Sequence, residues 1–120
     1  MNKIYHLANC DTCQKIIRKE WNSGENCELQ NIKAENISAK ALDFAAEKLG
    51  SYEALFSRKA MKYRQLGLHE QQLSEQDYRR LILEEYTFLK RPVLFVGEAV
   101  FAGNTKAAVA AGKEALEKMK

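Results

Sequence analysis

Two different spacings of apolar residues run through the first third of the chain. Residues 3–7 are short, β-branched and aromatic, and predict a strand. From Cys13 to about Asn22 the apolar positions recur at helical spacing, and Gly24 is predicted to end this helix in a left-handed conformation. Residues 27–33 alternate and predict a second strand. This strand–helix–strand order favours two parallel strands joined by a right-handed crossover.

The middle of the chain has mainly helical patterning. Ser38 is predicted to cap a helix whose apolar stripe ends at Gly50, and residues 52–56 predict a further short helix. Residues 57–68 are polar and predict an irregular connection. Ser74 and the acidic residue three positions later predict a capping box for a helix that runs to about residue 86.

The last third changes character again. Residues 93–96 form a continuous apolar run, which is typical of a strand buried on both faces. A Gly-Glu turn leads into a returning strand at residues 99–102, and Asn104 or Thr105 is predicted to cap a closing helix. The whole order predicts an α/β protein with a mixed sheet of four strands and helices on both faces.

Length and composition narrow the class of protein. A chain of 120 residues is predicted to form a single domain, residues 1–120, with its own core. The sequence has no apolar run long enough for a membrane helix, and residues 1–6 lack the apolar core of a signal peptide, so we expect a cytoplasmic protein with no membrane partner. The net charge of +3 is spread along the chain, which argues against direct nucleic-acid binding.

The motif Cys10-Asp11-Thr12-Cys13 lies where the first strand turns into the first helix. A helix N-terminus carries partial positive charge and unpaired N–H groups, which favour a thiolate and can hold an oxyanion. Asp11 and Thr12 are able to cap the helix. The pattern therefore indicates thiol redox chemistry near an anion site.

Other interpretations of the cysteines have less support. A zinc site needs two further thiolate or imidazole ligands, and only Cys27, His6 and His69 remain, without a second Cys-x-x-Cys pair. We therefore predict no metal. Two buried, inert thiols are a further alternative, although Cys10 lies on a polar turn. Cys27 is expected to lie on a strand, partly or wholly in the core.

Four more residues are candidates for the site. Pro92 is the only proline, and a proline beside a redox loop would expose a carbonyl to a substrate; the alternative is an ordinary proline at the entry to a strand. Arg58 and Arg91 have the planar group that suits oxyanions and carboxylates, although most arginines are surface charges. His6 ends the first strand, and a charged imidazole there would stabilise a nearby thiolate, whereas a buried neutral one would not.

Three stretches together resemble one family. They are residues 4–6 through the Cys-x-x-Cys pair, residues 55–58 through 63–68, and residues 90–94. In this order and spacing the chain resembles the family that joins the glutaredoxin-coupled arsenate reductases with the Spx regulators. The resemblance implies a thioredoxin-like (glutaredoxin-like) fold, a helical insertion at about residues 36–88, and a cis peptide bond at Pro92.

The resemblance also implies roles for residues. Cys10 would attack the arsenate, and the histidine would lower the pKa of that thiol. No cofactor would be bound, and glutathione with glutaredoxin, or thioredoxin, would supply electrons. The residues expected to bind the substrate are Arg58, Arg91, His6, Asp11 and Thr12.

Two departures from the reductases matter. Those enzymes have serine where this chain has Cys13, and they have a third arginine where residues 101–105 have none. Cys13 is thus a candidate resolving thiol for a thiol-dependent oxidoreductase acting on an oxyanion or a disulfide. Alternatively, Cys10 and Cys13 form the reversible disulfide of an Spx-like regulator, which binds the RNA polymerase α subunit. A structural module with idle cysteines is the third possibility.

Overall fold

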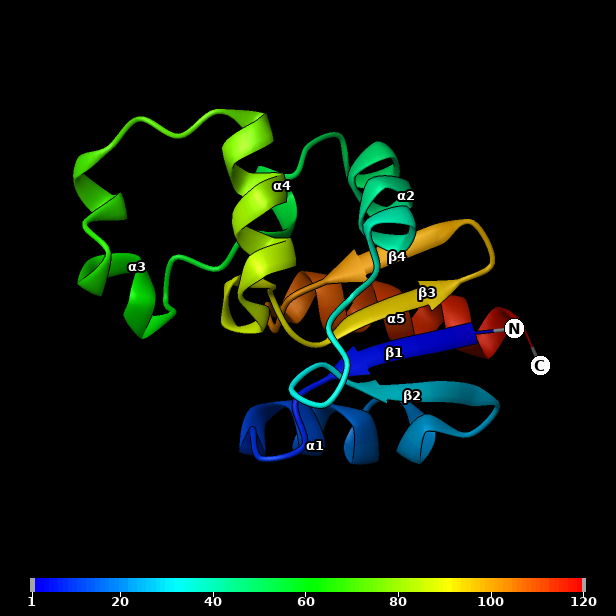
Figure 1. Cartoon of the computed structure of the whole chain (residues 1–120). Helices are drawn as coiled ribbons and strands as arrows, with labels where there is room; N and C mark the ends of the chain where they lie inside the picture. Colours follow the sequence, from blue (N-terminus) through cyan, green and yellow to red (C-terminus); the bar gives the residue numbers. More distant parts are fainter. Residues whose placement is uncertain (1, 120) are drawn as a thin grey trace. The chain divides into compact units, whose positions relative to one another are not determined.

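Four strands form one mixed sheet in the order β2-β1-β3-β4 (Figure 1). The computed structural model describes residues 2–119. Strand β1 (Asn2–His6) runs parallel to β2 (Cys27–Asn31) and antiparallel to β3 (Val93–Val96), which pairs in turn with the antiparallel strand β4 (Ala99–Ala102). The predicted fold class, an α/β protein with a mixed four-stranded sheet, is confirmed.

Helices α1 (Asp11–Lys19) and α5 (Lys106–Lys118) pack against one face of this sheet. The core between them contains Ile4, Ile17, Trp21, Leu94 and Val96. Ile17 and Trp21 are four residues apart, so both side chains lie on the same side of the helical segment. Leu94 and Val96 alternate along β3, so both lie on the same face of the sheet. The core thus holds the C-terminal part of α1 against the middle of β1.

Trp21 connects the two helices directly. Its ring is 1% exposed, and its Nε1 donates a hydrogen bond to the Val109 carbonyl at 3.2 Å. Gly112, one turn further along α5, lies so close that an added Cβ would be 2.9 Å from Leu94 Cδ2 and 3.3 Å from the Trp21 ring. The absence of a side chain at Gly112 is what lets α5 approach the sheet at this distance.

The chain divides into two compact units. The sheet, α1 and α5 belong to the unit made of the residues up to Glu35 and from Arg91 onwards, and residues 36–90 form the other. The single domain with an insertion at about residues 36–88 stays a prediction.

The second unit contains α2 (Ala39–Leu49), α3 (Met61–Gln65) and α4 (Glu75–Glu84), with short 3₁₀ turns between them. Ser38 caps α2, Gly50 ends it at φ 95°, and Ser74 begins α4 with a complete capping box, all as predicted. The irregular connection predicted for residues 57–68 is wrong in part, because α3 lies within it. This helix has no buried residue, so no apolar stripe marked it in the sequence.

No helix in the part of the chain that the structure describes combines the length and the apolar character needed to cross a membrane.

Gly112→Ala should destabilise the protein although alanine favours a helix. Alanine in a helix interior is more favourable than glycine by about 1 kcal/mol of stability, whereas overpacking a filled core lowers stability by about 1–3 kcal/mol. We expect a net loss of about 1 kcal/mol, measured by urea unfolding. The exposed Ala111→Ser is the control and should change stability by less than about 0.5 kcal/mol.

The same substitution in a Leu94→Ala background separates the two effects. Removing the Leu94 side chain relieves the closest contact, so Gly112→Ala should there be neutral or stabilising. A Gly112→Ala variant that stabilises the otherwise unchanged protein would contradict the tight packing described above.

Candidate active site

Cys10 occupies the N-cap position of α1, at φ −100° and ψ 108°. Its N–H donates to the Leu7 carbonyl at 3.0 Å, and its own carbonyl accepts from the Gln14 N–H at 3.1 Å, the first bond of the helix. The predicted caps, Asp11 and Thr12, are wrong, because Cys10 is the N-cap and these two are the first two residues of the helix. The nucleophile candidate therefore lies at the positive end of the helix itself.

The predicted end of α1 is also wrong. The helix ends at Lys19, with Glu20 as its C-cap. Gly24 has the predicted left-handed conformation, at φ 75°, but it lies in a separate 3₁₀ turn, Asn22–Gly24.

The pKa of the Cys10 thiol is lowered from its ordinary value. Partial burial works in the opposite direction and raises it, but three groups outweigh burial. They are the backbone N–H of Cys13, the Cys13 thiol, and the guanidinium of Arg91, which all stabilise the thiolate. The Cys10 side chain makes no capping hydrogen bond to the first turn of α1.

The pKa of the Cys13 thiol is shifted in the opposite direction. Cys13 is fully buried, and burial is the main cause that raises the pKa of its thiol to about 12. The neighbouring Cys10 raises it further, whereas the Leu7 N–H and Arg91 oppose the shift. Neither thiol is in a disulfide. Of the two thiols on the first turn of α1, Cys10 is thus the one that ionises more readily.

Sheet topology explains why Arg91 reaches the cysteines from so far along the chain. Tyr5 near the end of β1 pairs with Val93 at the start of β3. The loop that follows β1 and the residues that precede β3 therefore emerge at the same end of two neighbouring strands. Arg91 and Cys10 are brought together by the strand pairing.

The peptide bond between Arg91 and Pro92 is cis, as the resemblance implied. Pro92 is buried, and its carbonyl accepts a hydrogen bond from the Gly103 N–H at 3.0 Å. We expected this proline to expose a carbonyl to a substrate. The carbonyl of Pro92 itself instead accepts a hydrogen bond from the residue that follows β4.

His6 has a partner that the sequence did not reveal. Its Nδ1 lies 3.1 Å from Nε2 of Gln14, and partial burial lowers its pKa. The groups that shift the pKa of Cys10 do not include this imidazole. Activation of the thiol by a charged His6 stays a prediction without support from these contacts.

Arg58 belongs to the second unit. Its guanidinium contacts the Glu53 carboxylate and donates to the Tyr78 hydroxyl at 2.9 Å, and it lies over the Tyr78 ring. The predicted substrate-binding role of Arg58 therefore requires it to leave or share these partners. Asp11 and Thr12 are exposed on the first turn of α1, and their substrate-binding role stays a prediction as well.

Cys27 is half-buried at the start of β2, as expected for a strand residue beside the core. Burial raises the pKa of its thiol, which makes it a poor nucleophile. Within residues 2–119, no three His, Cys, Asp or Glu side chains are grouped so that they could hold a metal ion.

Comparison with known proteins identifies the family. The model of the ArsC family matches residues 5–111, nearly the whole chain. The chain belongs to the ArsC family.

Solved structures agree with this ArsC assignment at the level of the fold. An arsenate reductase from Vibrio cholerae is 20% identical, with a TM-score of 0.77 over 92% of this chain and 96% of that one. An arsenate reductase (ArsC)-related protein from Brucella melitensis is 26% identical, with a TM-score of 0.68 over 92% of each chain.

An ArsC-family-related protein from Bacteroides fragilis is 20% identical, with a TM-score of 0.78 over 99% of this chain and 97% of that one. No curated protein sequence matches the chain. The thioredoxin-like fold predicted from the sequence is confirmed by these likenesses.

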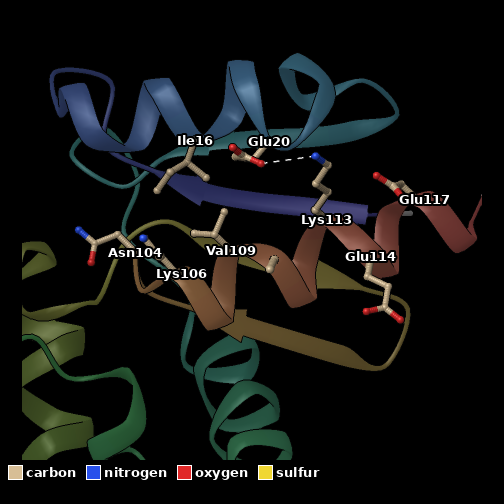
Figure 2. A pocket seen from close by; sticks show the side chains of 9 residues that line it. Ile16, Glu20, Asn104, Lys106, Val109, Lys113, Glu114 and Glu117 are labelled. Carbon is tan, nitrogen blue, oxygen red and sulfur yellow. Dashed lines mark ion pairs between the residues drawn. The ribbon is translucent and has the colours of Figure 1, made fainter.

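This ArsC-family chain also has a groove between α1 and α5 that the sequence did not predict (Figure 2). Its volume is about 720 Å³, and Lys113 and Glu20, paired at 3.6 Å, reach across it. The groove is lined by Ile16, Glu20, Asn104, Lys106, Val109, Ala110, Lys113, Glu114 and Glu117. No thiol is among the residues that line it.

The pH profile of alkylation tests the charge assignment. With iodoacetamide, Cys10 should react first, with a midpoint below the value of about 8.5 of a free thiol. Cys13 should stay protected in the folded protein because it is buried. Peptide mass spectrometry identifies the labelled cysteine.

Arg91→Met should raise the midpoint of Cys10, because it removes a positive charge that stabilises the thiolate. The matched control is Arg18→Met, which removes the same charge from an exposed position of α1 and should move the midpoint much less. A Cys10 midpoint at or above the free value, or equal shifts in the two variants, would contradict the site as described.

Proposed function

We propose that this chain is a thiol-dependent oxidoreductase in which Cys10 is the nucleophile and Cys13 the resolving thiol. The observation that carries the proposal is the convergence of the Cys13 N–H and the Arg91 guanidinium on a Cys10 sulfur at the start of α1. This arrangement favours the thiolate form of Cys10 and places positive charge where an anionic substrate would bind. Membership of the ArsC family, and the arsenate reductases among its structural neighbours, favour arsenate as the substrate.

The first step is attack of the Cys10 thiolate on the electron-poor atom of the substrate. With arsenate, a sulfur–arsenic bond forms and an oxygen leaves as water. With a disulfide, a mixed disulfide forms and one thiolate leaves. Arg91 would stabilise the negative oxygen atoms of arsenate, and Arg58 would join it if it exchanges Glu53 for the substrate.

The second step uses the buried thiol of Cys13. Cys13 loses a proton and attacks the Cys10 sulfur, the Cys10–Cys13 disulfide forms, and the bonding pair of the sulfur–arsenic bond leaves with arsenic as arsenite. The Cys10 thiolate raises the pKa of Cys13 in the free protein, and this repulsion ends when Cys10 is bound to arsenic. Adduct formation thus makes the resolving thiol easier to ionise.

The oxidised pair must be reduced before another turnover. We propose glutathione with glutaredoxin, or thioredoxin, as the electron donor, in a cytoplasmic setting where such donors are present. Asp11, Thr12 and His6 would border the same substrate position because they flank the Cys10 loop.

A second candidate is a redox-sensing regulator of the Spx type that binds the RNA polymerase α subunit. The observation that favours it is that the two free thiols lie on one helical turn, close enough for each to shift the pKa of the other, which is the arrangement that a reversible disulfide would need. In this case oxidation would change the affinity for the partner and no substrate would be consumed.

Arsenate turnover with glutathione and glutaredoxin tests the enzyme. Cys10→Ser should reduce the rate to the uncatalysed level, because the nucleophile is gone. Cys13→Ser should lower turnover because the resolving thiol is lost, whereas the control Cys27→Ser should leave it unchanged. Arsenite release is measured.

The outcomes separate the candidates. Arsenate reduction that survives Cys10→Ser would end the enzyme proposal. Full activity of Cys13→Ser would make glutathione the resolving thiol and remove Cys13 from the mechanism. No turnover of arsenate or of a small disulfide, together with binding of the polymerase α subunit that changes on oxidation, would favour the regulator.

A further inference from the structure

The side chain of Gln14 contacts both the end of β1 and the loop that leads to Cys10. Gln14 lies on the first turns of α1 and is half-buried. Its Nε2 is 3.0 Å from the Leu7 carbonyl oxygen and 3.1 Å from Nδ1 of His6. One amide nitrogen thus bridges a backbone group and an imidazole.

These two contacts determine the protonation of the His6 ring. The Leu7 carbonyl is an acceptor only, so the atom of Gln14 that faces it must be the amide nitrogen. The second hydrogen of that nitrogen is then available to Nδ1 of His6, which must accept it. A neutral ring that accepts at Nδ1 carries its proton on Nε2.

The backbone of Leu7 links Gln14 to both cysteines. Its carbonyl also accepts the Cys10 N–H at 3.0 Å, and its own N–H faces the Cys13 sulfur. A carbonyl oxygen has two lone pairs, so it accepts from Cys10 and Gln14 together. Movement of the Leu7 peptide would therefore disturb the position of one cysteine and the hydrogen bond of the other.

We propose that Gln14 is a positioning residue, which holds the Leu7 peptide against the two cysteines and fixes His6 as the neutral Nε2–H tautomer. The proposal rests on the proposed thiol chemistry of Cys10. The anchoring of α1 in the core comes from Ile17 and the neighbouring Trp21, so the amide of Gln14 is not needed to hold the helix on the sheet. The neutral ring leaves Nε2–H as a donor, and activation of Cys10 depends on Arg91 and the start of the helix.

Two nearly isosteric variants test this role. Gln14→Met removes both donated hydrogen bonds, and Gln14→Glu replaces the donor by an acceptor. The matched control is Gln76→Met, which changes an exposed glutamine on the first turn of α4. Thermal unfolding confirms that each variant is folded before any other measurement is interpreted.

The first readout is the ¹⁵N spectrum of the His6 ring. The chain has two histidines, so His69→Gln leaves one imidazole to assign. We expect protonated Nε2 and bare Nδ1 at pH 7. Gln14→Met should give a mixture of tautomers, and Gln14→Glu should bring a proton to Nδ1. A ring protonated at Nδ1 in the unchanged protein would overturn the proposal.

The second readout is the rate of Cys10 alkylation by iodoacetamide at pH 7. Gln14→Met should lower it about three- to tenfold, because a small displacement of a reacting group lowers its rate. The Gln76→Met rate should stay at the starting value. Equal rates in Gln14→Met and the control would also overturn the proposal.

Neither readout requires turnover. If arsenate and disulfides are not reduced but both readouts change as expected, Gln14 positions the thiols of a protein whose substrate differs from the one proposed. If turnover is found but both readouts are unaffected, the oxidoreductase proposal stands and the role of Gln14 fails.

Discussion

The site depends on one electrostatic constraint, which is that a negative charge on one of two neighbouring sulfur atoms disfavours ionisation of the other. Burial disfavours the thiolate at both positions, and the neighbouring backbone N–H groups, Cys13 and Arg91 compensate for it at Cys10. At Cys13 burial dominates instead. The asymmetry follows from position, because Cys10 is the partly exposed N-cap of α1, whereas Cys13 is fully buried.

The sheet supplies the cation that this constraint requires. Arg91 is far from Cys10 in sequence, but β3 is the neighbour of β1 and runs in the opposite direction. The residues before β3 therefore lie beside the residues after β1. The same pairing brings the buried Pro92 near the loop that leads to Cys10, and the hairpin from β3 to β4 returns Gly103, whose N–H donates to the Pro92 carbonyl. A local pair of cysteines thus becomes a site only when the long-range pairing forms.

Much of this could be predicted from the sequence, because the signals are local. The strands, the caps at Ser38 and Ser74, and the Cys-x-x-Cys turn each leave a short pattern. Helix α3 left none, since it buries nothing. The contacts of Gln14 and Arg58 could not be predicted from the sequence. Each depends on which polar atom the fold brings nearby, and no sequence spacing identifies the partner of a glutamine or an arginine.

The backbone N–H of Leu7 offers a way to follow the state of Cys13 by NMR. Because the N–H of Leu7 faces the sulfur of Cys13, that one amide proton senses whether the sulfur is a thiol or half of a disulfide. Its chemical shift would follow oxidation without any added label. The amide of Leu7, one residue beyond the end of β1, would thus report the formation of the proposed Cys10–Cys13 disulfide.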